Sequence, residues 1–394
     1  MVLGAGLLQT PVIKKAREIG HYVIAVDDDP KAPGMEMADK AIVPGGLCDE
    51  DKILSIARTE QIDGVIHPCS EVAMTVMGRI NDEMHLSGIS KEMAIRATNK
   101  HLMREAFEKY GAPSPKSYLT KDEEDAWHLF SYQFITNAIL KPSRNSGSRG
   151  IAKVVKGISK KSFFDLYRRA LSESRDHQVL IEEFIEGPEF SVEVIVWNNH
   201  PYVLAITDKK TSGAPYFVEL GHNQPSIYPV EVQKKLKDGA IAGIQALELN
   251  NCAAHCELKL QYDKVYLMEI GARMGGDFIS TELTHLSTGI DMVAAAIDVI
   301  LGNEPNLMPT SPQYGVCIRY FTPKSGRLSA IDNKEVLQDE SVYDYNIYYQ
   351  VGDMIPEVKS SLDRSGHVIV TDVSVKSAID KADFIVSKVK FSTI

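Results

Sequence analysis

The sequence has few cysteines and no block of basic residues. Five cysteines in 394 residues, odd in number and widely spaced, exclude a disulfide framework and fit reduced thiols in the cytoplasm. They are Cys48, Cys69, Cys252, Cys256 and Cys317. The formal net charge of −10 is spread along the chain without a lysine- or arginine-rich run, so the chain offers no electrostatic footprint for nucleic acid.

The sequence also lacks a long apolar run. The N-terminus has neither the basic start nor the continuous apolar core of a signal peptide, and the most apolar late stretch, MVAAAIDVILG, is interrupted by Asp298. We therefore expect no membrane partner. What the chain has instead is 44% apolar residues over its 394, enough to bury the cores of two or three domains.

Clusters of proline and glycine divide the chain into four units, which predict a mixed α/β and α+β fold. Residues 1–112, the N-terminal unit, alternate strands and helices as a parallel sheet does, and their first strand is so short that its start looks clipped. Residues 113–187 form a small unit, and residues 188–310 form a central unit with long strands. Three nearby prolines then precede a strand-rich C-terminal unit, residues 311–394.

Apolar periodicity predicts the individual elements. The expected helices cover residues 11–19, 49–61, 90–97, 100–110, 159–173, 230–247 and 290–301. The expected strands cover residues 22–26, 62–66, 134–140, 151–155, 178–184, 189–197, 201–206, 252–260 and 265–270.

The first turn partly fits a dinucleotide-binding fingerprint. Gly4 and Gly6 follow a strand, and Asp27 lies about 20 residues further on, as a ribose-binding carboxylate would. Gln9, however, occupies the third glycine position. We therefore favour a structural turn or a substrate pocket over a nicotinamide or flavin site.

No G-x-x-x-x-G-K-[ST] string occurs, so a nucleoside triphosphate would need another cradle. In ILKPSRNSGSRG, Lys141 closes a strand, and the loop of residues 143–150 offers backbone N–H groups and Arg149 to phosphates. A solvated hairpin loop is the alternative. The strand end LIEEFIEGPE then places the carboxylates of Glu182, Glu183 and Glu189 beside apolar residues. This requires a cation, a sugar or an amine nearby unless the strand lies at an edge.

Glu257 and Glu269 lie on two strands joined by a turn near residue 263, each between apolar neighbours. Two converging carboxylates repel each other unless a hard cation lies between them, which favours Mg²⁺ or Mn²⁺. Arg273, four residues past Glu269, would supply a fixed charge for phosphate or carboxylate.

A zinc site at Cys252, His255 and Cys256 is disfavoured, because strand alternation puts His255 and Cys256 on opposite faces. Cys256 is expected in the core. His222 lies in FVELGHNQPSIYP, which reads as a loop, and by itself it carries little weight.

The order and spacing of these motifs, from Lys100 to Arg273, resemble the ATP-grasp superfamily of carboxylate–amine ligases over roughly residues 1–310. The resemblance implies an ATP-grasp fold, with a parallel-sheet pre-ATP-grasp domain, a small lid domain, a central antiparallel-sheet domain and a strand-rich C-terminal segment. The segment EIGARMGG has Gly271 where many relatives have a metal-binding Asn. This segment, together with ELGHNQP, looks most like the corresponding segments of the branch of L-amino-acid ligases.

The resemblance also implies roles for individual residues. Those assigned to ATP are Lys100, Lys141, Ser146, Gly147, Ser148, Arg149, Gly150, Glu182, Glu183, Phe184, Ile185 and Glu189. Among them the two lysines and the loop would contact phosphates, Glu182 and the Phe184–Ile185 backbone the adenine, and Glu189 the ribose. Glu257 and Glu269 would hold Mg²⁺, and Arg273 and His222 would hold an acyl phosphate.

The implied activity is ATP-dependent joining of a carboxylate to an amine through an acyl phosphate, in a cytoplasmic enzyme that forms a homodimer. The substrates would be small molecules of amino-acid type. A purine-pathway ligase or carboxylase, or a carbamoyl-phosphate-synthase-like enzyme, keeps the fold and changes the substrate. A non-catalytic ATP-binding scaffold is the third hypothesis.

Overall fold

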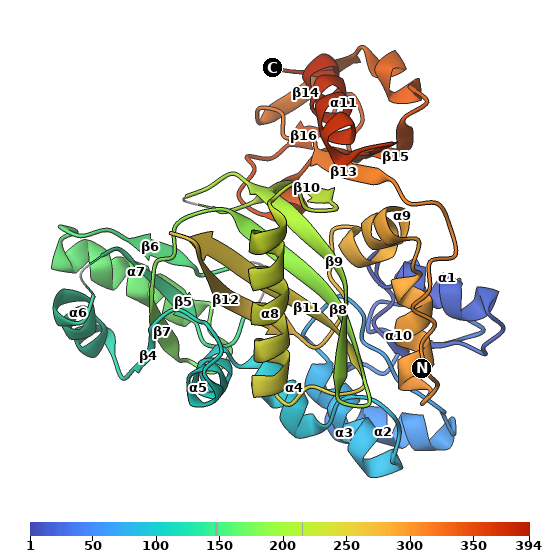
Figure 1. Ribbon diagram of the computed structural model, residues 1–394, viewed down its shortest axis with the longest axis horizontal. Coiled ribbons are helices and arrows are strands. Elements are labelled where there is room, and N and C mark those ends of the chain that lie inside the picture. The colour runs from blue at the N-terminus through green and yellow to red at the C-terminus, as the bar shows by residue number, and fades with distance from the viewer. Residues whose placement is uncertain (135, 146–148, 215) are drawn as a thin grey trace.

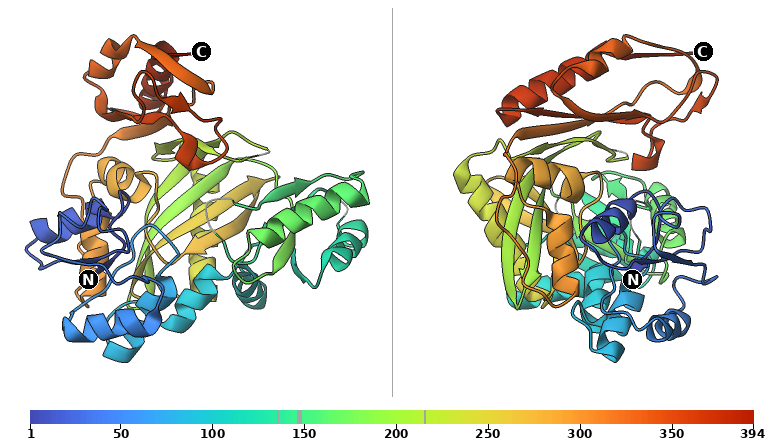
Figure 2. Two further views of the ribbon diagram at one scale, coloured as in Figure 1. Left: turned by 180° about the vertical axis from the view of Figure 1, so that it is seen from behind. Right: turned by 90° about the vertical axis from the view of Figure 1, so that its right-hand side faces the viewer.

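The computed structural model describes residues 1–134, 136–145, 149–214 and 216–394. An eight-stranded sheet forms its centre, with one four-stranded and two three-stranded sheets around it. In Figure 1 the small unit projects to one side of the large sheet and the N-terminal unit lies at the other side and below. Figure 2 shows from two further directions that the C-terminal unit lies at one end of the large sheet, to which it contributes strands.

The N-terminal sheet is parallel, as predicted, in the order β1 (Val2–Leu3), β2 (Ile24–Val26), β3 (Lys40–Ile42). The strand predicted over residues 62–66 is reduced to a single bridge between Ile66 and Val2, because the chain leaves the sheet again before Pro68. Five helices accompany the sheet: α1 (Thr10–Glu18), α2 (Glu50–Thr59), α3 (Met74–Met84), α4 (Lys91–Thr98) and α5 (Lys100–Tyr110).

The prediction of α5 is confirmed at both ends. The Asn99 side chain accepts hydrogen bonds from the N–H groups of His101 and Leu102, which caps the first turn. Gly111 ends the helix in the left-handed region at φ 71°, where glycine is the favoured residue.

The side chain of Asp27 holds the first glycine turn in place. Gly4 has φ 86°, and Asp27 accepts a hydrogen bond from the Ala5 N–H at 2.6 Å. The aspartate that a dinucleotide site would use for ribose is therefore bound to the turn, which fits the structural alternative.

The small unit is a four-stranded antiparallel sheet in the order β4 (Ser117–Thr120), β7 (Val179–Glu183), β5 (Ala138–Pro142), β6 (Ala152–Val154). Two helices pack on it, α6 (Glu123–Tyr132) and α7 (Lys160–Ser172). Phe130 and Phe163 stack with ring centroids 5.4 Å apart in their shared core. The expected strand over residues 134–140 begins later, at Ala138.

The large sheet spans two of the predicted units. Its order is β12 (Lys264–Gly271), β11 (Cys252–Gln261), β8 (Glu189–Trp197), β9 (His200–Thr211), β10 (Glu219–Gln224), β13 (Gly315–Tyr320), β17 (Gly366–Asp372), β15 (Val342–Ile347). The predicted boundary at residue 310 thus falls inside one hydrogen-bonded sheet, since β10 pairs with β13.

Strand alternation on β8 separates the two faces of this sheet. Val194 packs in the core that includes α8 (Val230–Ala246), whereas Ile195 packs with α10 (Met292–Ile300) on the other face. Because side chains of a strand alternate, Glu193 points to the same face as Ile195. That face also carries the polar groups of the candidate site.

The C-terminal unit adds a second three-stranded sheet and one long helix. Its remaining elements are β14 (Gly326–Asp332), β16 (Met354–Ile355), β18 (Lys390–Thr393) and α11 (Val375–Lys388). The unit is strand-rich, as predicted, but α11 was not expected, and it packs against β13 and β17. Across the described residues no single helix is long and apolar enough to cross a membrane; residues 279–288 and 292–300 pass that test only as a pair bent by 116°.

His67 gives the fold a testable pH dependence. Its ring is buried, with Nδ1 2.7 Å from the Leu3 carbonyl, and burial lowers the pKa of His67 from 6.5 to about 4. As pH falls from 7 to 5 the unfolded chain gains a proton that the folded chain does not take up, so stability falls with pH. Between pH 7 and pH 5 we expect the free energy of unfolding of the wild-type protein to fall by about 2 kcal/mol more than that of His67→Gln. Urea unfolding of both proteins at pH 7 and pH 5 measures it, and an unchanged difference would contradict it.

Candidate active site

A cavity of about 210 Å³ lies where the small, central and N-terminal units meet. The predicted residues that line it are Lys100, Lys141, Arg149, Glu182, Glu183, Phe184, Ile185, Glu189, Glu257, Glu269 and Arg273. His222 and Gly150 are not among the residues that line it. Ser146, Gly147 and Ser148 lie outside the described residues.

The two predicted metal carboxylates face each other. Glu257 on β11 pairs directly with Glu269 on β12 in the strand register, as the hairpin pattern predicted. Lys100 donates to Glu269 Oε1 at 2.9 Å, and Lys209 donates to Glu257 Oε1 at 3.0 Å. Burial alone would raise the pKa of Glu257, but Lys209 and His255 hold it well below its usual range.

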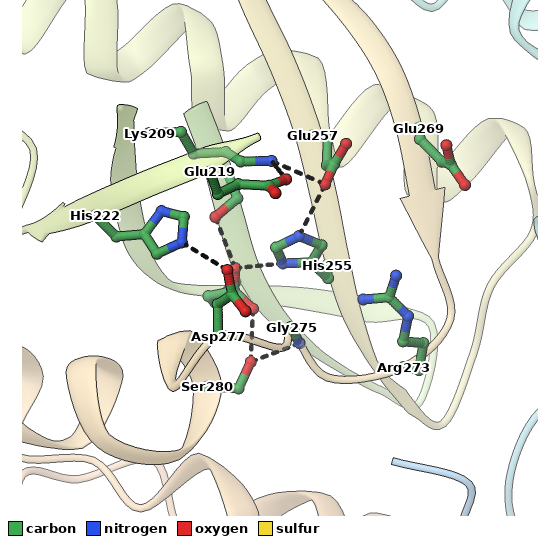
Figure 3. A network of polar contacts seen from close by, with 12 residues as sticks. Lys209, Glu219, His222, His255, Glu257, Glu269, Arg273, Gly275, Asp277 and Ser280 are labelled. Carbon is green, nitrogen blue, oxygen red and sulfur yellow. Dashed lines mark hydrogen bonds and ion pairs between the residues drawn. The ribbon is translucent and has the colours of Figure 1, made fainter. Parts of the chain in front are cut away.

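A buried network of polar contacts reaches Glu257 through His255 (Figure 3). His255 Nδ1 lies 2.7 Å from Glu193 Oε1, and His255 Nε2 lies 3.4 Å from Glu257 Oε1. Glu193 also accepts hydrogen bonds from Ser280 at 2.8 Å and Ser191 at 3.0 Å. Burial lowers the pKa of His255, but Glu193 outweighs burial and raises that pKa to about 9.

The donor set fits a hard divalent cation rather than zinc. Cys252 and Cys256 are buried in the core with α8, and His255 is committed to carboxylates. Within the described residues no group of three or more His, Cys, Asp or Glu is placed to share an ion. The two carboxylates Glu257 and Glu269 would provide the protein ligands. Mg²⁺ would then take its other ligands from phosphate and water, as it usually does in nucleotide sites.

Gly271, which stands where the resemblance led us to expect an Asn, lies against the side chain of Arg273. A Cβ at Gly271 would lie 3.1 Å from Nε of Arg273 and 3.2 Å from its Cγ. The Arg273 side chain therefore occupies the space in which an Asn side chain would start.

Arg273 has an unmet donor at the cavity. Its Nη1 donates to the Met274 carbonyl at 3.1 Å and its Nη2 lies 3.6 Å from Glu71. Its Nε is buried and has no hydrogen-bond partner in the described part of the chain. A buried guanidinium with a spare N–H suits an anionic ligand.

Glu182 is more committed than the sequence suggested. It is 1% exposed and lies between Lys141 Nζ at 2.6 Å and Arg104 Nε at 2.8 Å. Burial would raise the pKa of Glu182, but the two cations lower it to about 2. Glu182 thus holds Lys141 in the cavity wall, and an adenine contact by its carboxylate would compete with these ion pairs.

The remaining nucleotide-binding candidates surround a cationic and aromatic end of the cavity. Lys153 Nζ lies 3.8 Å from the centroid of the Phe184 ring, and Glu189 pairs with Lys259 at 2.8 Å. The Phe184 N–H donates to the Asn137 carbonyl at 3.1 Å, so the predicted adenine contact by its backbone rests on its carbonyl oxygen.

His222 is not in a loop, and that prediction was wrong. It lies on β10, paired with β9 and β13, because the polar segment around it is an interior strand whose backbone groups are satisfied on both sides. Its ring is buried and Nε2 lies 3.4 Å from Asp277 Oδ2. Burial lowers the pKa of His222, against the opposing effect of Asp277.

The site residues that the sequence did not indicate include Lys209 and Glu71, which line the cavity, and Arg104, which pairs with Glu182. Lys100 and Arg104 share the buried face of α5, and two charged residues four apart beside Met103 and Phe107 were a signal. Lys209, whose side chain is 4% exposed, followed an apolar strand. Burial and Glu269 raise the pKa of Glu71 to about 7.

Comparison with known proteins agrees with this geometry. Residues 134–282 match the ATP-grasp domain family and residues 319–393 match L-amino acid ligase C-terminal domain 2. The chain is 26% identical over 274 residues to alanine–anticapsin ligase of Bacillus subtilis (strain 168), which covers 64% of this chain and 57% of that enzyme. It is 24% identical over 322 residues to phosphoribosylamine–glycine ligase of Lactococcus lactis subsp. lactis (strain IL1403), covering 78% and 76%.

Solved structures share the whole architecture. L-amino acid ligase from Bacillus licheniformis has a TM-score of 0.82 at 20% identity, covering 100% of this chain and 98% of that chain. Phosphoribosylglycinamide synthetase from Anaerococcus prevotii has a TM-score of 0.78 at 24% identity, with the same coverage of both chains. The solved structures show that the chain has the ATP-grasp fold, and residues 134–282 match the ATP-grasp domain family itself. Residues 319–393 are similar to the C-terminal domain of L-amino acid ligases.

Proposed function

We propose that this chain joins a carboxylate to an amine in an ATP-dependent reaction that passes through an acyl phosphate and releases ADP and phosphate. The facing pair Glu257 and Glu269 carries the proposal, because it lines one cavity with Lys100, Lys141 and Arg273. Substrates of amino-acid type are supported by the C-terminal domain match and by the relatives named L-amino acid ligase and alanine–anticapsin ligase.

The residues have distinct tasks in this proposal. Lys100 and Lys141 hold the ATP phosphates, the segment of residues 182–185 holds adenine, and Glu189 holds the ribose hydroxyls. Glu257 and Glu269 hold Mg²⁺, or Mn²⁺, which neutralises charge on the transferring phosphoryl group when it is bound. One solved relative of this fold, a biotin carboxylase domain from Hydrogenobacter thermophilus, contains MgADP.

The reaction needs no protein nucleophile. An oxygen of the substrate carboxylate attacks the γ-phosphorus, the bond to the β-phosphate oxygen breaks, and ADP leaves. The amine nitrogen then attacks the acyl carbon, loses a proton, and phosphate departs with the former carboxylate oxygen. Arg273 stabilises the anionic charge on the acyl phosphate throughout.

We also assign a role to each of the four predicted units. Residues 1–112 act as the pre-ATP-grasp domain, 113–187 as the lid, 188–310 as the central domain and 311–394 as the C-terminal segment. We also propose a cytoplasmic homodimer; all five cysteines are free thiols, in keeping with a reducing compartment.

A purine-pathway reaction is the second candidate, favoured by the match to phosphoribosylamine–glycine ligase over 78% of the chain. The scaffold hypothesis is weaker, because a protein that only binds ATP has less need of two facing carboxylates. Assays with phosphoribosylamine and glycine separate the first of these from an amino-acid ligase.

A substrate screen tests the proposed function. Each amino acid is paired with every other, and phosphate release is measured with MgATP. We expect release that needs both an acid and an amine, and hydroxylamine in place of the amine should trap the acid as a hydroxamate. Phosphate release that is equal with and without added acid would contradict the proposal.

A further inference from the structure

Arg364 of the C-terminal unit reaches into the region behind the cavity. It follows a short 3-10 helix (Ser361–Asp363) and is 8% exposed. Its Nη1 and Nη2 donate to the two carboxylate oxygens of Asp277 at 2.6 and 2.7 Å. Its guanidinium also lies 3.6 Å from the centroid of the Tyr320 ring. The pair is the bidentate, stacked kind for which Lys is no substitute.

The guanidinium is fixed on its remaining sides. Nε donates to the Ser361 carbonyl at 2.7 Å, and Nη1 lies 3.3 Å from the Glu219 carbonyl. Ser360 and Asp363 cap the same turn with reciprocal hydrogen bonds. Arg364 therefore presents one orientation to Asp277.

Asp277 belongs to the loop that carries Arg273. It lies four residues after Arg273, and Asp277 and Phe278 have φ of 52° and 64°, values that L residues rarely adopt. Figure 3 shows Arg273 and Asp277 on the chain segment that leaves β12 and passes Gly275. The bidentate pair thus anchors the loop at the residue where its backbone enters the left-handed region.

Asp277 and the turn before Arg364 each contact one further side chain, His222 on β10 and Glu219 in the cavity wall. His222 Nε2 lies 3.4 Å from Asp277 Oδ2, so Asp277 orients the His222 ring. Ser361 Oγ donates to Glu219 Oε2 at 2.5 Å, and Glu219 lines the cavity.

The C-terminal unit does not depend on Arg364 for its attachment to the central unit. The backbone ladder between β10 and β13 joins that unit to the central one through four residue pairs, and Arg319 on β13 donates to Asn223 Oδ1 on β10 at 2.8 Å. Loss of Arg364 would therefore release the loop and leave the units joined.

We propose that Arg364 is a positioning residue of the active site. It acts through Asp277 on the loop of Arg273 and on His222. Through this contact the C-terminal unit completes the end of the cavity where the acyl group is activated. The inference rests on the proposed ligase function.

A double-mutant cycle tests it with Arg364→Gln, Asp277→Asn and both together. Arg327→Gln is the matched control, since Arg327 lies in the same unit and donates to the Gly352 carbonyl away from the cavity. We expect each site variant to lower kcat at least about tenfold while KM for ATP changes less than about threefold. The double variant should be no slower than the worse single one, because both act through one pair. Wild-type kcat in Arg364→Gln, or losses that multiply in the double variant, would overturn the proposal.

A readout independent of turnover separates this inference from the proposed function. The ring ¹⁵N signals of His222, assigned with His222→Gln, should shift in Arg364→Gln and stay unchanged in Arg327→Gln. Unchanged His222 signals in Arg364→Gln would overturn the positioning role even in an active ligase. If wild-type protein forms no product from any acid and amine, the proposed function fails, and shifted His222 signals still support the contact chain.

Discussion

Glu257→Gln and Glu269→Gln are each expected to lower phosphoryl transfer at least about a thousandfold, a loss of about 4 kcal/mol of transition-state stabilisation. Each change removes one of the two anionic ligands that face each other across β11 and β12. Gln keeps the shape of Glu, and Lys209 and Lys100 remain hydrogen-bonded neighbours of the two positions. ADP release at saturating MgATP, acid and amine measures the effect.

Glu189→Gln is the comparison for both variants. Glu189 lines the same cavity but lies at the nucleotide end, paired with Lys259 at 2.8 Å. Its change should raise KM for ATP and leave kcat within about threefold of the wild-type value, as expected for a group that binds ground and transition states alike. If the three variants lose kcat equally, the assignment of Glu257 and Glu269 to the metal is wrong.

Arg273→Ala should lower kcat by about 100- to 1,000-fold, the usual loss when one donor to a developing oxyanion is removed. ATP binding should change little, because Arg273 lies beside Glu71 and Gly271 and contacts none of the described residues assigned to the nucleotide. Turnover and the Kd for ATP, measured on the same preparation, separate the two effects.

Arg273→Lys completes this prediction. Lys retains the charge but not the planar donors, so it should recover only part of the lost rate. An alanine variant with wild-type turnover, or one that loses ATP binding as strongly as turnover, would contradict the role given to Arg273.

Local sequence pattern predicted the parts of the fold that depend on local physics. The helix over residues 100–110 has a capping Asn and a terminal Gly, and the hairpin of Glu257 and Glu269 follows from alternation around a tight turn. The missed helix α3 has no side-chain cap and carries Gly78 in its middle. A Cβ at Gly78 would lie 2.6 Å from the Ser90 carbonyl, so that glycine serves close packing against a distant segment, which no local pattern records.

The missed site residues depend on contacts between distant parts of the chain. Arg104 acquires its role from Glu182, 78 residues away, and Lys209 from Glu257, 48 residues away. His222 was placed in a loop because its neighbours are polar, and only pairing with β9 and β13 makes that segment a strand. The carboxylates could be found from sequence because they stand among apolar residues, whereas Arg104 and Lys209, which neutralise Glu182 and Glu257, owe their roles to these distant contacts.

Transfer of oxygen from the substrate acid tests the central claim most directly. An acid labelled with ¹⁸O in its carboxylate is incubated with the enzyme, MgATP and the amine, and the released phosphate is analysed by mass. Because the γ-phosphoryl group passes to a carboxylate oxygen, the account predicts one ¹⁸O in each phosphate released. Unlabelled phosphate at the same rate of ADP formation would mean that water, and not the acid, accepts the phosphoryl group.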